Sequence, residues 1–522
     1  MTTAPAPRVL VIGLDAGDAN LIQQWAHEGH LPVLQQLMQE GAWGRLKTTT
    51  DLGHTSVWPS IFTGTSPGDH GIYSVIQSVP GSYDILPVWA NQRRQPNFWQ
   101  YLDRNGTKCV IFDAPFDCPI EGFKGIQILE WGSWIRFWEQ EGFPRRTWKQ
   151  LRDRLPLPPI QPGTIVYRQN PSQLRQLYDW LTIGIGLKAR AVKWLMTQEP
   201  WDVFVTVFRE PHPAGHYFWR LDASHRANST NSHQNFLRNV YTALDQALGE
   251  ILSGLNDQVT VFIVSGDGMG PNYSGWHLLP DVLRKLGFLI VNCGTFQEGS
   301  GGAVWNPDGF LSAIRKMVPA DLRMKISGLL PDPVRFRLRR RWSALPIDWD
   351  RSRAYYIPNE CEGQIRINLH GREPSGCVKD CIEYDGLCQE LSEQLTELVN
   401  PQTGQKAVRA VVRTDAVCGS RKNGLPDLMV LWDEKAKVTT ELYSEKCGRI
   451  SKSFSACDLS PYYVGNHRAP GFAIIKGTRM PKGPVLEGRH ILDLSPTFLD
   501  LFGISQPSPM SGEAWTDLWN GT

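Results

Sequence analysis

Short, continuous apolar runs alternate along the chain with longer segments in which apolar residues recur at helical spacing. Runs of this length without polar alternation predict strands that are buried on both faces of a parallel sheet. The predicted strands include residues 8–13, 110–113, 201–208, 258–264, 427–432 and 472–475, and the predicted helices include residues 21–38, 98–105, 172–196, 235–255, 378–399 and 492–502. This alternation indicates an α/β fold with a parallel, doubly wound sheet.

Polar residues follow three of the predicted strands directly. Asp15 comes after the first strand, His212 and His216 follow the third, and Asp267 follows the fourth. Because the carboxyl ends of parallel strands meet at one edge of a sheet, where open α/β folds bind ligands, we expect these side chains to lie close together. Asp15 could also cap the helix that follows it, and the two roles are compatible.

The two histidines after the third strand are four residues apart. Pro211 and Pro213 fit only near the start of a helix, so His212 and His216 would share one face of its first turns. Two imidazoles on one helix face can bind one divalent metal ion. The spacing alone is a weak signal, and a purely structural pair of histidines is the alternative.

The segment 48–73 combines hydroxyl side chains with a predicted helix start. Pro59 suits the first turn of a helix that ends near Gly64, so Thr55 and Ser56 lie just before a helix N-terminus. Free N–H groups and the helix dipole at that end favour a phosphate group or a developing alkoxide. One of these hydroxyls is therefore a candidate nucleophile, and the alternative is that both only cap the helix.

Two segments predict additions to the sheet domain. Residues 130–197 read as a mainly helical insertion, broken by the proline-rich stretch at 155–163. Residues 282–345 read as an irregular insertion or lid that becomes basic in RFRLRRRW at 335–342. A solvated helix face is the simpler interpretation of that basic run, and a phosphate clamp is the alternative.

Composition excludes several classes of function. The net charge of +2 gives no electrostatic reason to expect nucleic-acid or anionic-membrane binding. We expect no leader peptide and no membrane span, because neither the required pattern at the start nor a long apolar run occurs. The ten cysteines form no CxxC pair, and Cys377, Cys381 and Cys388 have poor metal spacing, so we expect reduced thiols and a cytoplasmic protein.

Taken together, these motifs resemble the alkaline phosphatase superfamily, in particular its type I phosphodiesterase/nucleotide pyrophosphatase branch. The resemblance extends over nearly the whole chain, and GQIRINLHGREPSG also resembles a feature of bacterial members. The other matching pieces, in family order, are VIGLDAGD, WPSIFTGTSPGDHGIY, FREPHPAGHYFW, SGDGMGPN, GNHRAPGFAI and LDLSPTFLDLFGISQPSPMSGEAW.

The resemblance implies a single catalytic domain over residues 1–522, with a mostly parallel sheet between two helix layers. It also implies two divalent metal ions, usually zinc, with Mn²⁺ or Mg²⁺ as alternatives. The implied reaction is the hydrolysis of a small phosphodiester or nucleotide pyrophosphate through a covalent Thr or Ser intermediate. A metal-dependent phosphomutase is a further reaction that the same resemblance leaves open.

The resemblance carries over to individual residues unevenly. Asp15, His216 and His467 match family metal ligands, and Thr55 or Ser56 lies in the nucleophile region, although the usual nucleophile position falls on His54. Together with the strand-end residues, the expected metal site consists of Asp15, His212, His216, Asp267 and His467.

Two departures put the metal site in question. The family usually has an Asp where this chain has His212, and Ser-Asp-His-Gly where this chain has Ser-Gly266-Asp267-Gly. Glu210 or His54 could replace the missing ligand. Loss of a negative ligand weakens metal binding or shifts metal preference. A one-metal site is therefore one alternative, and a catalytically degenerate or regulatory protein on the same fold is another.

Overall fold

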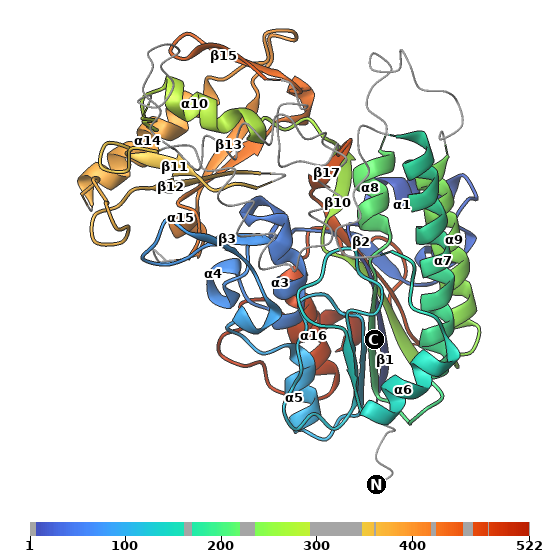
Figure 1. Ribbon diagram of the computed structural model, residues 1–522. Coiled ribbons are helices and arrows are strands. Elements are labelled where there is room, and N and C mark those ends of the chain that lie inside the picture. Colours follow the sequence, from blue (N-terminus) through green and yellow to red (C-terminus); the bar gives the residue numbers. More distant parts are fainter. Residues whose placement is uncertain are drawn as a thin grey trace, which may run out of the picture.

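An eight-stranded sheet forms the centre of the protein, with the strand order β2-β18-β9-β1-β8-β5-β6-β7 (Figure 1). The five strands from β9 to β6 are parallel, and β2, β18 and β7 run antiparallel to their neighbours. The strands are β1 (Arg8–Leu14), β2 (Ala42–Leu46), β5 (Cys109–Phe112), β6 (Ile126–Leu129), β7 (Glu141–Phe143), β8 (Val203–Phe208), β9 (Val259–Ser265) and β18 (Gly471–Lys476). The predicted mostly parallel α/β sheet is confirmed.

The computed structural model describes residues 7–160, 170–219, 235–292, 347–359, 362–379, 381–418, 424–452, 463–478 and 480–520. Within these ranges, no helix is both long enough and apolar enough to cross a membrane.

Both faces of the sheet are covered because the central strands are apolar on both sides. Leu10, Ile12 and Leu14 of β1 belong to one buried cluster, and Val9 and Val11 belong to the other. One helix layer contains α1 (Ala19–His27), α2 (Pro32–Glu40), α7 (Pro171–Leu195) and α9 (Phe236–Leu252), and the other contains α3 (Val57–Thr63), α5 (Phe98–Arg104) and α16 (Leu494–Leu501) (Figure 1). The predicted helices in these layers are found close to their expected bounds, except that the segment predicted at 21–38, with a break near Pro32, forms the two helices α1 and α2.

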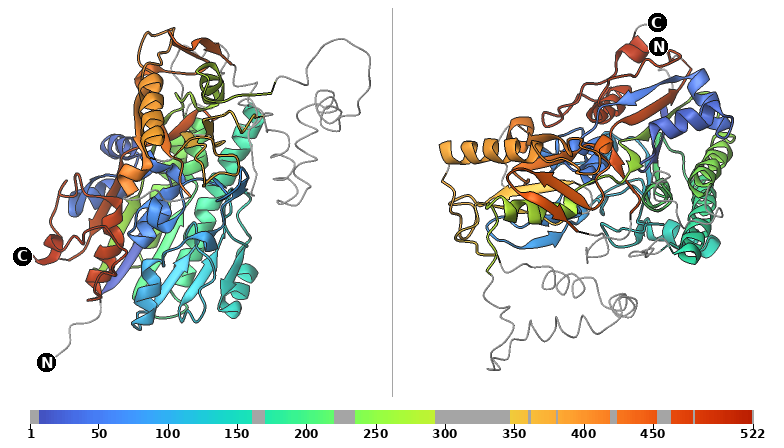
Figure 2. Two further views of the ribbon diagram at one scale, coloured as in Figure 1. Left: turned by 90° about the vertical axis from the view of Figure 1, so that its left-hand side faces the viewer. Right: turned by 90° about the horizontal axis from the view of Figure 1, so that it is seen from above.

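A second, smaller sheet has a hydrophobic core of its own (Figures 1 and 2). Its four strands are antiparallel in the order β11-β12-β14-β13. The part consists of α10 (Leu279–Lys285), β11 (Ala354–Tyr356), β12 (Gly363–Ile367), α14 (Ile382–Thr396), β13 (Val408–Arg413), β14 (Leu428–Trp432) and the hairpin β15 (Glu441–Ser444)–β16 (Gly448–Ser451). The buried strand predicted at 427–432 is therefore β14 of this sheet and not a strand of the central sheet.

A short two-stranded ribbon connects the two parts near the end of β9. The sequence at 465–468 indicates a loop that carries His467, and this expectation is wrong, because these residues form β17 (Gly465–Arg468), which pairs antiparallel with β10 (Gly268–Pro271). The chain that leaves β9 continues into β10, and its backbone groups bond to those of β17. The register sets Met269 opposite His467 and so brings His467 beside the end of β9.

The remaining elements are shorter. Helical content predicted for 130–197 is found in α6 (Arg145–Arg154) and α7, and α7 packs against α9. Most of the predicted basic insertion or lid at 282–345, from residue 293 onward, lies outside the described residues. The other elements are α4 (Pro67–His70), β3 (Ile76–Ser78), β4 (Ile85–Pro87), α8 (Pro211–Phe218), α15 (Thr414–Cys418), α17 (Asp517–Asn520) and the 3-10 turns η1 (Thr50–Leu52), η2 (His54–Ser56), η3 (Ala90–Gln92), η6 (Trp276–Leu278), η7 (Glu434–Ala436) and η9 (Ile491–Asp493).

A buried histidine in α4 makes the stability of the fold depend on pH. His70 is fully buried, its Nδ1 accepts from the Ile72 N–H, and its Nε2 lies 2.9 Å from Ser60 Oγ. Burial, with help from Arg93, lowers the pKa of His70 to about 3. Below about pH 6.5 the unfolded chain therefore binds a proton that the folded chain does not bind, and stability falls as the pH falls toward 3.

We expect His70→Gln to reduce this acid sensitivity. The slope of the unfolding free energy against pH between about 4 and 6 should decrease by up to about 1.4 kcal/mol per pH unit, the value for one proton. Urea unfolding of the wild type and the variant at several pH values measures the two slopes. Equal slopes would show that His70 is protonated in the folded protein.

Candidate functional site

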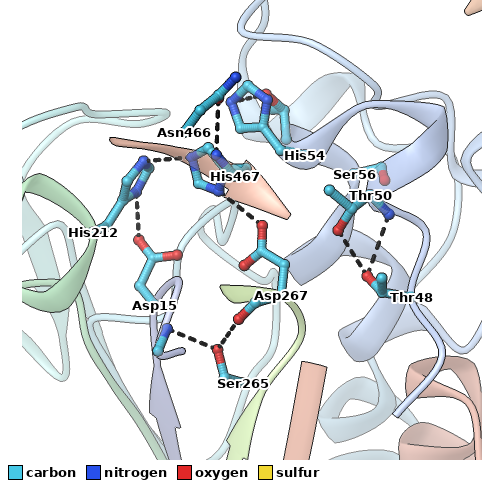
Figure 3. Close-up of polar contacts among 12 residues, drawn as sticks. Asp15, Thr48, Thr50, His54, Ser56, His212, Ser265, Asp267, Asn466 and His467 are labelled. Atoms are coloured by element: carbon cyan, nitrogen blue, oxygen red, sulfur yellow. Dashed lines mark hydrogen bonds and ion pairs between the residues drawn. The ribbon is translucent and has the colours of Figure 1, made fainter. Parts of the chain in front are cut away.

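The strand ends and the β10–β17 ribbon bring five of the predicted site residues together, and Figure 3 shows four of them, Asp15, His212, Asp267 and His467. Asp15 follows β1, Asp267 follows β9, and α8 begins three residues after β8 and carries His212 and His216. Ser265 Oγ accepts from the Gly17 N–H at 3.0 Å and donates to the Asp267 carbonyl at 2.7 Å, which ties the ends of β1 and β9 together. These side chains therefore lie together at one edge of the sheet, as expected from the sequence.

Three imidazoles point their Nε2 atoms toward one another. His212 Nε2 lies 3.0 Å from His216 Nε2 and 2.9 Å from His467 Nε2. The three rings offer ligand atoms that all lie within 4.8 Å of one another, and they form a possible metal-holding cluster among the described residues. Imidazole nitrogens arranged in this way suit zinc and related transition metals.

The opposite nitrogen of each ring has an oxygen partner. His212 Nδ1 lies 3.0 Å from Asp15 Oδ2, His467 Nδ1 lies 2.8 Å from Asp267 Oδ2, and His216 Nδ1 lies 2.9 Å from the Gly465 carbonyl. A carbonyl oxygen and an ionised carboxylate only accept hydrogen bonds, so Nδ1 of His212 and of His216 carries a proton and Nε2 of each keeps a lone pair. The same holds for His467 when Asp267 is ionised. Metal-binding histidines in proteins have this pattern of outer partners.

The pKa values at the site favour unprotonated imidazoles. Burial and the neighbouring imidazoles hold the pKa of His216 and of His467 well below the ordinary value. Burial and the nearby carboxylates of Asp15, Glu362 and Asp18 raise the pKa of Asp267 well above its ordinary value. Neutral imidazoles are the form that binds metal, and a cation would relieve the repulsion among the carboxylates.

The second oxygen of Asp15 is also occupied. Trp58 donates its indole N–H to Asp15 Oδ1 at 2.7 Å. The indole reaches this position because Gly13 has no side chain, and a Cβ there would clash with the Trp58 ring. Burial acts to raise the pKa of Asp15, but His212, Arg209 and the bond from Trp58 outweigh it, so the pKa is lowered.

The position that should carry an Asp in the family offers no space for one. A Cβ on Gly266 would clash with Val57 Cγ1 and lie 2.8 Å from Ile61 Cδ1. The apolar side chains of α3 therefore occupy the space that a longer side chain would need. Gly266 supplies no ligand, and the chain cannot restore one without moving α3.

The two candidate hydroxyls have different surroundings. Ser56 is fully buried, and its Oγ lies 2.8 Å from Thr49 Oγ1 in a hydroxyl network that continues to Ser60. Figure 3 shows Ser56 apart from the imidazoles. Thr55 is 6% exposed, and its Oγ1 lies 3.4 Å from His54 Nε2.

His54 connects Thr55 to a residue that the sequence analysis missed. Glu362 Oε1 lies 2.7 Å from His54 Nδ1 and accepts from the His54 N–H at 2.8 Å, and Asn359 donates to the other carboxylate oxygen. Burial acts to raise the pKa of Glu362, but the interactions with His54 outweigh it and lower the pKa. The His54 ring also stacks on His467, with centroids 4.2 Å apart.

Glu362 gives no local signal in the sequence, because it immediately precedes β12 in the second sheet and reaches the site only through the tertiary fold. Of the two residues considered as replacement ligands, Glu210 points toward α7, where its Oε1 lies beside Gly184. His54 does lie at the site, with its Nε2 directed toward Thr55.

A cleft of about 360 Å³ adjoins His467. It lies between the second sheet and the ribbon, and its lining includes Glu362, Arg409, Trp432, Lys435 and Arg468. Arg468 is held by Asp18 at 3.2 Å and by Glu434 at 3.3 Å. The lining also includes the acidic residues Asp51, Asp433 and Glu434, so the cleft is polar and of mixed charge, with Trp432 as an aromatic surface.

Comparisons with known proteins agree with the predicted resemblance. The solved phosphonoacetate hydrolase from Sinorhizobium meliloti 1021, in complex with phosphonoacetate, is similar in fold, with a TM-score of 0.52 and 12% identity over 96% of this chain and 97% of that chain. Human ectonucleotide pyrophosphatase / phosphodiesterase 5 aligns at 12% identity over 98% of this chain and 100% of that chain, with a TM-score of 0.47.

No curated protein sequence matches the chain. Residues 9–455 match the family described as Type I phosphodiesterase / nucleotide pyrophosphatase, which confirms the resemblance inferred from the motifs. The chain therefore belongs to the type I phosphodiesterase / nucleotide pyrophosphatase family.

Proposed function

We propose that this protein hydrolyses small phosphodiesters or nucleotide pyrophosphates through a covalent intermediate on Thr55. The observation that carries this proposal is the position of a threonine hydroxyl beside His54, whose ring stacks on His467 of the three-histidine cluster. Membership of the family supports phosphoryl transfer as the class of reaction. The names of the similar solved structures refer to phosphonates and nucleotides, and both kinds of compound are compatible with phosphoryl transfer.

The residues that would hold a divalent metal ion are His212, His216 and His467, and the donor set fits zinc best. When bound, the ion would act as a Lewis acid that neutralises charge on a phosphoryl oxygen. The unprotonated Nε2 atoms and their Nδ1 partners support this assignment.

Thr55, His54 and Glu362 would carry the first proton transfer. The Thr55 Oγ1 attacks phosphorus, its proton passes to His54 Nε2, and Glu362 stabilises the resulting imidazolium through Nδ1. The new bond joins Oγ1 to phosphorus, and the bond to the leaving oxygen breaks as that oxygen takes a proton from the imidazolium. Water then attacks phosphorus and releases phosphate or its monoester, and the Thr55 oxygen regains a proton.

The cleft beside His467 would hold the rest of the substrate. Its volume of about 360 Å³ lies near the lower end for small-molecule sites. Lys435 would bind an anionic group there, and Trp432 offers an apolar surface. Arg409 and Arg468 also line the cleft, where they pair with Asp51 and with Asp18 and Glu434. A small ester or a mononucleotide fits this lining better than a polymer does.

An activity panel tests the proposal. Purified protein loaded with Zn²⁺ or Mn²⁺ should hydrolyse at least one of bis-p-nitrophenyl phosphate, p-nitrophenyl phosphate and ATP. Activity should fall in chelator and return with either metal, because the site binds the metal through neutral imidazoles. Absence of hydrolysis across the panel, with metal content verified, would contradict the proposal.

A non-catalytic binding protein on the same fold is the second candidate. It is favoured by Gly266, where Val57 and Ile61 leave no space for the acidic side chain that the family usually has. Such a protein would bind phosphate esters in the cleft without turnover. Isothermal titration with a diester that also serves in the activity panel distinguishes binding from hydrolysis.

A further inference from the structure

We propose that this chain binds one metal ion and not two, through His212, His216 and His467, and that Asp15 and Asp267 orient these histidines from outside the coordination shell. The proposal deepens the proposed function, on which its chemical consequence rests. It concerns the number of ions and the role of each side chain, which family membership alone does not determine.

The first argument is the direction of the imidazoles. All three rings point Nε2 inward, and His212 Nε2 lies 3.0 Å from His216 Nε2 and 2.9 Å from His467 Nε2. All three rings also bond outward through Nδ1 to an oxygen acceptor. Three neutral histidines around one ion leave a further coordination position open, as catalytic zinc sites require.

The second argument is what Asp15 and Asp267 already contact. Asp15 Oδ1 accepts from Trp58 at 2.7 Å, and Asp15 Oδ2 contacts His212 at 3.0 Å. Asp267 Oδ2 contacts His467 at 2.8 Å. A carboxylate that bonds to the Nδ1 of a ligand histidine fixes the orientation and tautomer of that ring. Asp15 is thus positioned to orient His212, and both of its oxygens already have a partner on the protein.

The third argument is the lack of space for a side chain at position 266. The family resemblance places one carboxylate of a second metal site at Gly266, where a side chain would clash with Val57. Val57 and Ile61 are 2% and 0% exposed, so the space is filled by the packed core of α3. The nucleophile position of the resemblance holds His54, which contacts Glu362. A second ion would therefore lack the carboxylate that the resemblance places at position 266, and Val57 and Ile61 leave no room for one there.

The chemical consequence concerns Thr55. If only one ion is bound, His54 and Glu362 would activate the Thr55 hydroxyl. His54 lies beside Thr55 and contacts Glu362, so the two residues can accept the hydroxyl proton as a pair. A general base that is oriented by a carboxylate is a recurrent replacement for metal activation of a hydroxyl nucleophile.

Metal titration of the full chain tests the inference without substrate. Metal-free protein is titrated with Zn²⁺ by calorimetry and with Co²⁺ by visible absorption, and the bound metal is counted by elemental analysis after dialysis. We expect one equivalent of bound metal per chain. The visible absorption spectrum of the Co²⁺-loaded protein should be typical of a site with a low coordination number. His467→Ala should abolish tight binding, and the matched variant His490→Ala, which changes a partly buried histidine elsewhere, should not.

A second measurement tests whether the carboxylates act from outside the coordination shell. Asp15→Asn should keep the stoichiometry at one and weaken affinity by about 10–100-fold, the usual effect of losing an outer-shell partner. Circular dichroism and thermal melting check that each variant is folded.

Two equivalents of tight Zn²⁺, or the loss of a whole equivalent in Asp15→Asn, would overturn the inference. One bound ion with no hydrolysis of any substrate would instead overturn only the proposed function. The two failures are therefore distinguishable.

Discussion

Replacement of Thr55 by alanine is expected to reduce kcat for phosphate-ester hydrolysis by a factor of about 10³ or more, because it removes the attacking oxygen. Bound metal should stay unchanged, since Thr55 is not part of the three-histidine cluster. Steady-state kinetics with bis-p-nitrophenyl phosphate measure the loss. Mass spectrometry of acid-quenched wild-type protein should find phosphate or its ester on the peptide that contains Thr55.

Ser56→Ala is the matched control for this experiment. The Ser56 hydroxyl is fully buried and contacts Thr49, so its loss should cost about 1 kcal/mol of stability and change kcat little. Thermal unfolding and the same kinetic assay measure both effects. A large loss of kcat in Ser56→Ala with an active Thr55→Ala protein would assign the nucleophile to Ser56. Full activity in both variants would contradict a hydroxyl intermediate.

The sequence predicted the positions of the strand-end residues because they depend on local pattern. Asp15 follows a run that is apolar at every position, and such a run becomes a central parallel strand wherever helices cover both faces. His212 and His216 follow a similar run, and Pro211 starts the helix that sets both rings on one face. Each of these features is encoded within about ten residues, so pattern alone was sufficient.

The parts of the site that could not be predicted depend on tertiary packing. Glu362 reaches His54 across 308 positions of sequence, and its own neighbourhood gives no sign of this contact. Residues 465–468 become a strand because β10 supplies the backbone partner, and no apolar pattern in GNHR indicates it. Asp15 and Asp267 are expected from the sequence as metal ligands, and only their contacts with His212 and His467 in the folded structure indicate that they support the ligands instead.

The packing of α3 explains why the choice between Thr55 and Ser56 remained open from sequence. Both residues lie in the turn before the helix, and either could have faced the strand ends. Trp58 contacts Asp15 from the first turn of α3, and Val57 packs over Gly266. These two contacts fix the rotation of the helix start, with the Ser56 side chain in the buried hydroxyl network and Thr55 next to His54.

The pair formed by His54 and Glu362 gives the second large expected effect. Replacing Glu362 with glutamine removes the charge that stabilises an imidazolium on His54, and we expect kcat to fall by about 10²-fold with KM and bound metal unchanged. His54→Gln should reduce kcat by a similar or larger factor, because it removes the proton acceptor beside Thr55. Steady-state kinetics with bis-p-nitrophenyl phosphate and elemental analysis of bound metal provide the readouts.

The double variant separates a positioning role from a structural one. If Glu362 acts through His54, the His54→Gln/Glu362→Gln protein should be no slower than His54→Gln alone, because the effects of residues that act as one unit do not multiply. Glu441→Gln is a suitable control, since that carboxylate pairs with Arg449 on the β15–β16 hairpin, outside the cleft lining. Losses that multiply in the double variant would mean that Glu362 supports the fold independently of His54. An unchanged kcat in His54→Gln would remove His54 from the proton transfer and leave the activation of Thr55 to another group.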